Sequence, residues 1–143
     1  GMEVVEVPGA TGWLDTNYEG KARAALETLT RHDFAYVHVE APDEAGHAGS
    51  LDKKIQAIED FDGRIVAPVL AGLEDMAVPF RLLVMPDHPT PICRKTHTPD
   101  PVPYVLYDST VKRSVERRFT EKDAVSTGVF VEDASTLLAR LLK

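Results

Sequence analysis

The sequence predicts an α/β protein in which a mostly parallel sheet is flanked by helices. Short apolar runs typical of buried strands alternate with longer segments whose apolar residues recur at helical spacing. The first three segments follow the order strand, helix, strand, which favours a parallel crossover unit. With 143 residues, of which 43% are hydrophobic, the chain can bury one core of useful size. We therefore expect a single domain over residues 2–143.

The N-terminal third of the chain supplies this crossover unit. Glu3–Val7 alternates as a short strand, and a helix is expected over Asp15–Thr30 with its first residue as the N-cap. Phe34–Glu40 (FAYVHVE) is the second predicted strand and runs directly into a Pro-Asp-Glu-Ala-Gly-His turn. We therefore expect Asp43 and His47 at the tip of a rigidly held loop.

A long helix capped by Ser50 is expected next. Gly63 and Pro68 lie inside it, and Pro68 has no N–H to donate to the carbonyl four residues earlier. A kink or short break is therefore predicted between these two residues. The expected buried stripe consists of Leu51, Ile55, Ile58, Ile65, Val66, Val69 and Leu73.

Two more strands and two more helices are expected in the second half. Phe80–Met85 and Pro103–Tyr107 have the composition of strands of one sheet. Thr120 is expected to cap a short helix closed by Gly128, and Asp133–Leu142 to form the terminal helix. The leucines expected on the buried side of that helix are Leu137, Leu138, Leu141 and Leu142.

Charge and composition exclude several classes of partner. The formal net charge of -7 argues against binding to nucleic acid or to an anionic membrane, since both require a basic face. A local charged cluster is expected to be solvated surface; it comprises Lys112, Arg113, Glu116, Arg117 and Arg118. No apolar run approaches the roughly 20 residues that cross a bilayer, and no signal peptide opens the chain, so a cytoplasmic protein is expected. Gly1 before Met2 is expected to be a tag remnant.

Three residues that often carry chemistry are expected to be structural here. Cys93 is the only cysteine, which rules out an intramolecular disulfide and fits a reducing compartment. It has no flanking catalytic signature and is not expected to be a nucleophile. His32 ends a helix and His38 lies mid-strand, so neither is expected to bind metal.

Five other side chains have the character of metal ligands. Asp87 and His88 follow the strand Phe80–Met85, as Asp43 and His47 follow the preceding strand, and His97 lies in a proline-rich loop. Loops at the carboxyl ends of parallel strands converge on one crevice, so we expect all five to gather there. Mixed carboxylate and imidazole ligands suit manganese, zinc or iron. Five ligands favour two ions a few Å apart, an arrangement used for phosphoryl chemistry.

Four ordered motifs carry a family resemblance that covers nearly the whole chain. The motifs are GATGWLDTNYEGKA (9–22), VHVEAPDEAGHAG (37–49), MPDHPTP (85–91) and THTPDPVPYVLY (96–107). They resemble the C-terminal part of the archaeal-type, 2,3-bisphosphoglycerate-independent phosphoglycerate mutases, which are isomerases of glycolysis in the alkaline phosphatase superfamily. Related bacterial proteins are labelled homoserine kinases or phosphonopyruvate decarboxylases. The resemblance implies an alkaline phosphatase-like core fragment.

The resemblance also divides the ligands. It implies that Asp43, His47 and His97 hold one metal, while Asp87 and His88 contribute to a second. In the family, an aspartate and the Ser or Thr nucleophile, both from an N-terminal segment, complete the second site. Neither that segment nor the inserted domain that binds the substrate has a counterpart in these 143 residues. No catalytic residue is therefore assigned, and we expect at most one tightly bound ion, manganese or zinc.

Several readings of function follow from this division. The first is the metal-binding segment of a phosphoglycerate mutase-like enzyme, whose complete form acts on a phosphorylated small molecule. The alternatives are a degenerate, non-catalytic metal-binding domain, a segment of one of the related phosphotransferases, or a one-metal phosphoesterase that uses bound hydroxide. A core cut from a larger sheet should expose a strand edge, so a homodimer or a missing N-terminal segment is the expected partner.

Overall fold

The computed structural model describes residues 1–112 and 117–142. These form two compact units: residues 1–77 with 90–98, and residues 78–89 with the described residues from 99 onward. Each unit is described by itself, and the expectation of a single domain stays a prediction. Arg113 and Glu116 of the predicted charged surface lie outside the described residues.

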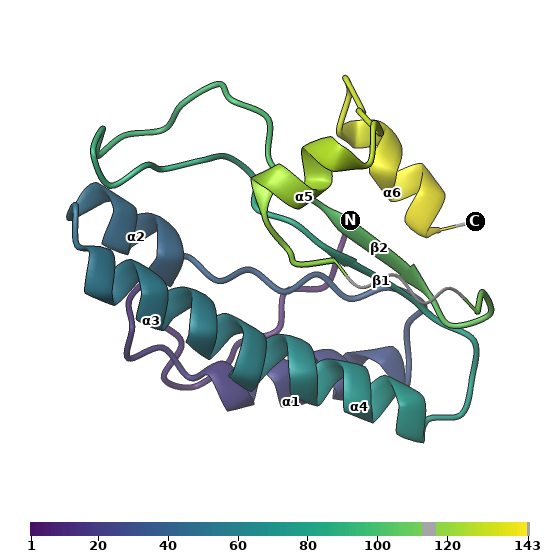
Figure 1. The fold of residues 1–143 in the computed structure, drawn as a ribbon. Helices are drawn as coiled ribbons and strands as arrows, with labels where there is room; N and C mark the ends of the chain where they lie inside the picture. The colour runs from purple at the N-terminus through teal and green to yellow at the C-terminus, as the bar shows by residue number, and fades with distance from the viewer. Residues whose placement is uncertain (113–116, 143) are drawn as a thin grey trace. The chain divides into compact units, whose positions relative to one another are not determined.

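Helix α1, Tyr18–Leu29, opens the first unit (Figure 1). It begins later than predicted because Asn17, and not Asp15, is the N-cap: Asn17 Oδ1 accepts from the Gly20 N–H at 2.9 Å. The Asp15 carboxylate is engaged elsewhere, since it accepts from the Thr11 hydroxyl at 2.8 Å. The helix buries one face, which includes Tyr18, Ala22 and Ala25.

The long helix predicted after Ser50 is interrupted where its sequence indicated. Helix α3, Leu51–Phe61, passes into a π-helical turn η1, Asp62–Val66, and then into α4, Ala67–Asp75. Ser50 is the N-cap, as predicted. Pro68 lies in the first turn of α4, where its missing N–H costs least. The π turn therefore accommodates the proline without ending the helical rod seen in Figure 1.

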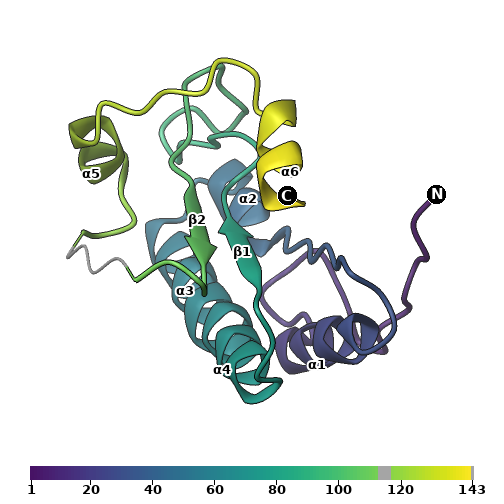
Figure 2. The ribbon, with the colours of Figure 1, turned by 90° about the vertical axis from the view of Figure 1, so that its right-hand side faces the viewer.

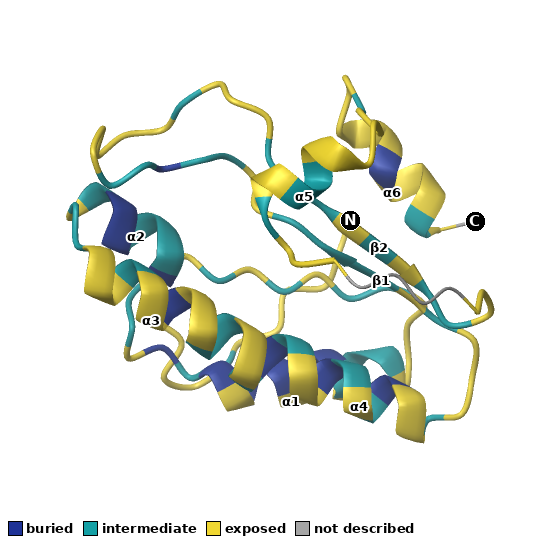
Figure 3. Cartoon of the chain, in the orientation of Figure 1, coloured by how far each residue is buried: buried dark blue, intermediate teal, exposed yellow. Residues whose placement is uncertain are grey.

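The predicted apolar stripe of this rod is only partly buried. Leu51, Ile55 and Ile58 on α3 are exposed, whereas Ile65, Val69 and Leu73 are buried. An extra residue in the π turn rotates the faces of the following helix relative to those before it, so one continuous helical stripe is not preserved. The buried half of the stripe belongs to η1 and α4, which contact α1; α1 lies beside α4 in Figure 2. In Figure 3, α3 is largely exposed, whereas α4 has buried positions on the side of α1.

The two N-terminal segments predicted as strands are extended but unpaired. Within the described residues, neither 3–7 nor 34–40 has a strand partner. A strand assignment needs a neighbour that closes the hydrogen-bond ladder, and apolar alternation alone does not supply one. Exposed Val4 and Tyr36 are consistent with this lack of a partner. The turn predicted after 34–40 is also different: it forms helix α2, Ala41–His47.

The second unit contains a two-stranded antiparallel sheet. Strands β1, Arg81–Val84, and β2, Val105–Asp108, confirm the two strands predicted in this half of the chain. Their register pairs Arg81 with Asp108, and the two side chains form an ion pair at 2.7 Å. A mostly parallel sheet is not seen among the described residues, whose strands all belong to this hairpin-like pair.

Two short helices complete the second unit. Helix α5, Glu121–Ser126, is capped by Thr120 as predicted. Helix α6, Ser135–Leu141, contacts β1. The prediction for its leucines was too broad: Leu137 is buried, but Leu138 and Leu142 are exposed, because the thin sheet beside the helix covers little of its surface. None of the helices in the described ranges is both long enough and apolar enough to cross a bilayer.

Candidate metal centre

Helix α2 presents two of the predicted ligands from one face. Asp43 and His47 are four residues apart, and Asp43 Oδ2 lies 3.3 Å from His47 Nε2. The prediction that Asp43 and His47 lie at the tip of a loop is therefore wrong, because both residues lie on a helix. Pro42 in the first turn favours helix initiation, and the Glu40 carbonyl accepts from the Asp43 N–H at 2.8 Å. Buried Ala45 anchors the opposite side of this short helix.

His97 reaches the same point from the loop 90–98, which has no regular structure, as predicted. Its Nε2 lies 3.1 Å from His47 Nε2 and 3.4 Å from Asp43 Oδ1. The two imidazole rings are tilted, with centroids 4.9 Å apart. All three side chains belong to the first unit. Residues that are far apart in sequence are thus brought together as one cluster of potential metal ligands.

A backbone contact sets the tautomer of His47. Its Nδ1 lies 3.0 Å from the carbonyl oxygen of Lys95. A carbonyl only accepts, so Nδ1 carries the proton and Nε2 of the neutral ring keeps its lone pair. Metal-binding histidines commonly have this arrangement, in which the second ring nitrogen donates to a carbonyl or a carboxylate. The lone pair of His47 consequently faces the region shared with His97 and Asp43.

The spacing of the donor atoms fits a small divalent cation. With metal–ligand bonds of about 2.1 Å, neighbouring donors lie about 3.4 Å apart in a tetrahedron and about 3.0 Å apart in an octahedron. The two histidine nitrogens lie 3.1 Å apart, which falls within this interval, and each lies 3.3–3.4 Å from one of the two Asp43 carboxylate oxygens. Two imidazoles and one carboxylate are also a poor set for calcium or magnesium, which prefer oxygen ligands.

The Asp43 carboxylate is hydrogen-bonded by Thr90, which is in turn held by Lys54. The Thr90 hydroxyl donates to Asp43 Oδ1, and Thr90 itself is buried. Lys54 Nζ donates to the Thr90 carbonyl at 3.1 Å. Burial lowers the pKa of Lys54, and the Asp43 carboxylate acts in the opposite direction. Thr90 and Lys54 were not singled out from the sequence, because neither residue stands in a ligand pattern and their contact joins segments 36 residues apart.

Asp87 and His88 follow β1 in the second unit. His88 Nε2 lies 3.3 Å from Asp87 Oδ2, and the His88 N–H donates to Asp87 Oδ1 at 2.9 Å. The structure therefore pairs these two predicted ligands with each other. Their assignment to a second metal stays a prediction.

The two histidines predicted to be structural lie elsewhere in the first unit. His32 Nε2 lies 3.1 Å from Glu3 Oε2, and His38 stacks on Tyr36 with ring centroids 6.4 Å apart. Neither belongs to a cluster of three or more potential metal ligands within the described ranges. Their expected structural role is compatible with these contacts.

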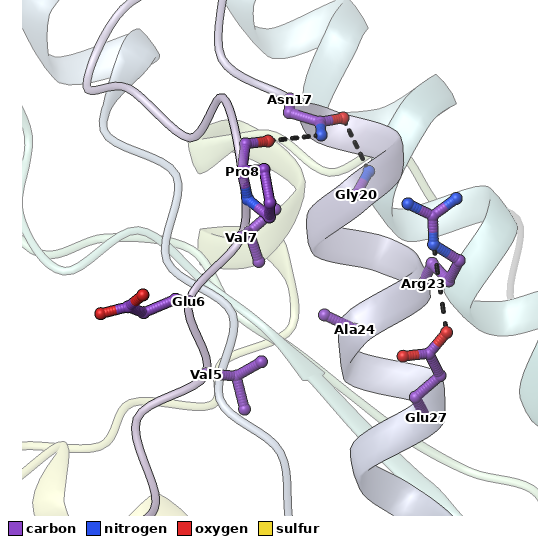
Figure 4. A pocket seen from close by; sticks show the side chains of 9 residues that line it. All are labelled: Val5, Glu6, Val7, Pro8, Asn17, Gly20, Arg23, Ala24 and Glu27. Atoms are coloured by element: carbon purple, nitrogen blue, oxygen red, sulfur yellow. Dashed lines mark hydrogen bonds and ion pairs between the residues drawn. The ribbon is translucent and has the colours of Figure 1, made fainter.

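A hollow beside α1 is a weaker candidate for a site. It lies between residues 5–8 and one face of α1, as Figure 4 shows. Asn17 bridges its upper edge, because its amide donates to the Pro8 carbonyl while its oxygen caps α1. Arg23 and Glu27 pair at 4.0 Å on the exposed helix surface. These groups stabilise the chain locally and do not converge on a shared point.

Comparisons with known proteins agree with the chemistry of the cluster. A model of the metalloenzyme superfamily matches residues 1–142. The chain is 56% identical to the 2,3-bisphosphoglycerate-independent phosphoglycerate mutase of Methanosarcina barkeri, with 100% of this chain and 36% of that protein covered. Identity to the protein of the same name from Methanothrix thermoacetophila is 47%, with coverage of 99% and 36%.

A solved structure resembles the fold as well. The structure of PH0037 protein from Pyrococcus horikoshii matches with a TM-score of 0.77 and 32% identity, covering 87% of this chain and 37% of that one. These matches confirm the resemblance predicted from the four motifs. The chain spans only 36% of the length of the two mutases that it matches.

Proposed function

Because the chain belongs to the metalloenzyme superfamily, we propose that it is the metal-binding segment of a cofactor-independent phosphoglycerate mutase. The complete enzyme would interconvert 3-phosphoglycerate and 2-phosphoglycerate, as a step of glycolysis. The convergence of Asp43, His47 and His97 is the observation that carries this proposal. Relatives named as such mutases, at 47–56% identity over essentially the whole chain, support it.

We assign the three converging side chains as ligands of one divalent ion. A bound ion would supply Lewis-acid stabilisation to a phosphoryl oxygen of the substrate. Asp43 provides the negative charge of the donor set, and His47 is already in the required tautomer through Lys95. Zinc and manganese are the proposed metals, because both accept mixed imidazole and carboxylate ligands.

Asp87 and His88 are proposed to contribute to a second ion. Two protein ligands are fewer than the three or four that usually hold a catalytic ion, so this half-site should bind weakly by itself. The family resemblance implies that an aspartate and a Ser or Thr nucleophile complete it. We therefore expect no mutase turnover from these 143 residues alone.

Two extended segments that have no strand partner in the described part of the chain support a larger sheet in the complete enzyme. We propose that 3–7 and 34–40 are strands of a mostly parallel sheet whose neighbours come from the rest of the family fold. Their exposed apolar residues, and the lack of a strand partner for either segment among the described residues, are consistent with that role. We also retain the cytoplasm as the proposed location, because a lone exposed thiol such as Cys93 persists most readily under reducing conditions.

Metal analysis after dialysis tests the ligand assignment. The unaltered chain should retain one equivalent of zinc or manganese, and His97→Ala should lose it. His88→Ala should retain the metal, as should His32→Ala, a matched control outside the cluster. Two tightly held equivalents, or retention by His97→Ala, would show that the ligand sets are wrongly divided.

A second candidate is a degenerate metal-binding domain, because the cluster of Asp43, His47 and His97 could hold an ion without supporting turnover. The two functions are separated by assaying the chain with 3-phosphoglycerate and manganese. The assay is repeated after adding the separately expressed remainder of a related mutase. Turnover only in the mixture supports the enzyme segment. Metal binding without turnover in either assay supports the degenerate domain.

A further inference from the structure

We propose that Thr90 is a positioning residue for the metal centre, whose hydroxyl fixes the orientation of the Asp43 carboxylate. This inference rests on the proposed function of the cluster. It concerns a residue that makes no predicted contact with metal or substrate. Its role would be to hold a ligand in place before the ion arrives, and so to reduce the ordering cost of binding.

The contacts of Asp43 show why its orientation matters. Its two oxygens face different histidines: Oδ2 lies 3.3 Å from His47, and Oδ1 lies 3.4 Å from His97. Rotation of the carboxylate about its terminal torsion would break this arrangement, and that torsion is intrinsically soft. The Thr90 hydroxyl donates to Oδ1 and thereby limits the rotation. A hydrogen bond to a charged carboxylate is stronger than one between neutral groups.

Thr90 is itself held in place from two sides. Its side chain is buried, with 4% of its surface exposed, and its carbonyl accepts from Lys54 Nζ at 3.1 Å. On the helix, Gly46 lies between the two ligands of α2 in sequence and faces Thr90 directly. A Cβ at Gly46 would come within 2.9 Å of Thr90 Cγ2. The absence of a side chain at Gly46 therefore allows the Thr90 hydroxyl to reach Asp43.

The same loop also fixes the second ligand of α2. Lys95, five residues after Thr90, provides the carbonyl that accepts from His47 Nδ1. Its φ of 54° lies in the left-handed region, which is uncommon for a residue other than glycine. The Lys95 N–H donates to the Pro91 carbonyl at 2.9 Å, which closes a turn within the loop. One loop thus orients Asp43 through a hydroxyl and His47 through a carbonyl.

The test compares variants that differ in the hydroxyl but conserve the shape. Thr90→Val keeps the branched side chain and removes the donor, whereas Thr90→Ser keeps the donor. Thr90→Ala and Thr90→Ser form a second pair that differs by a single oxygen. This second pair applies if the valine variant loses its far-ultraviolet circular dichroism signal. Thr30→Val is the matched control, because the Thr30 hydroxyl donates to the Glu27 carbonyl on an exposed turn away from the cluster.

Two readouts are measured on the full chain: the Kd for Zn²⁺ by competition titration, and the visible absorption spectrum with Co²⁺. Thr90→Val and Thr90→Ala should weaken Zn²⁺ binding by about 10- to 100-fold and should change the cobalt spectrum, which reports ligand geometry. Thr90→Ser and Thr30→Val should resemble the unaltered chain. A merely structural role for Thr90 would leave the cobalt spectrum unchanged in a variant that remains folded.

The outcomes separate this inference from the function on which it rests. If His97→Ala abolishes binding while both Thr90→Val and Thr90→Ala retain the original Kd and spectrum, the positioning role is wrong and the metal assignment stands. If the unaltered chain binds Zn²⁺ no more tightly than His97→Ala does, the proposed function is wrong and the positioning role is overturned with it.

Discussion

Replacing Gly46 by alanine should destabilise the chain, although alanine is the better helix former. Gly46 lies in α2 and is buried. Intrinsic propensity favours the substitution by up to about 1 kcal/mol. However, the new Cβ would lie within 2.9 Å of Thr90 Cγ2 and 3.0 Å of Lys54 Nζ, and closer still to the Thr90 carbonyl oxygen. Overpacking of this kind typically costs about 1–3 kcal/mol.

The obstacle is backbone and cannot be relieved by a rotamer change. The Thr90 carbonyl is fixed by the Lys54 ammonium, so α2 and the loop must separate to admit the methyl group. We expect a net loss of about 1–2 kcal/mol in the free energy of unfolding, since the steric cost exceeds the gain in propensity. Separation of the loop from α2 should also weaken Zn²⁺ binding, because Thr90 then withdraws from Asp43.

Gly63→Ala provides the matched control for this prediction. Gly63 is also helical, but a Cβ there would meet nothing within 4 Å. Relief of glycine's conformational entropy should therefore stabilise this variant by about 0.5–1 kcal/mol. Urea unfolding followed by circular dichroism measures both free energies. The reasoning is refuted if Gly46→Ala is as stable as Gly63→Ala, or if it binds Zn²⁺ with unchanged Kd.

Three other outcomes can be checked with the same preparations. Asn17→Ala should lower the free energy of unfolding by about 1 kcal/mol, and Ser50→Ala should lower it by less. The Asn17 cap bond is 2.9 Å long and the Ser50 cap bond 3.5 Å, and Asn17 makes a second hydrogen bond to a loop carbonyl. Equal losses in urea titrations would contradict this. Hydrogen bonds from Thr110 and then Arg81 lower the pKa of Asp108 from 3.8 to about 2, so its contribution to stability is present above pH 4 and is lost as the pH falls toward 2. Unfolding measured from pH 6 to pH 2 should show the deficit of Asp108→Asn shrinking over that window, and a constant deficit would argue against the shift. Light scattering should detect a homodimer at moderate concentration, and a clean monomer at high concentration would count against an exposed strand edge as the interface.

Local rules predicted the helical parts of this chain well. Ser50 and Thr120 were identified as N-caps from residue type, and the interruption near Pro68 followed from its missing N–H. The errors arose where a choice depended on neighbours in space. Asn17, and not Asp15, caps α1: its side chain also bonds the Pro8 carbonyl, while the Asp15 carboxylate bonds Thr11. Sequence spacing near the cap was compatible with both residues.

The strands were less predictable because pairing is a property of two segments. Phe80–Met85 was confirmed as β1, since β2 is present to satisfy its backbone. The equally apolar segment 34–40 has no such partner within the described residues and stays extended. Apolar alternation therefore indicated which segments are able to form strands. It did not indicate which of these segments pair with a neighbouring strand in this chain.

The metal cluster was predictable as a set of residue types, but its support was not. Asp43, His47 and His97 stand out because carboxylates and imidazoles are metal ligands in any context. Thr90 and the Lys95 carbonyl have no such signature, and they matter only because the loop returns to α2. The donors and the groups that orient them all belong to the first unit. The proposed primary site is therefore held by the packing of that unit alone, so its metal affinity should depend on contacts between α2 and the loop rather than on the sheet of the second unit.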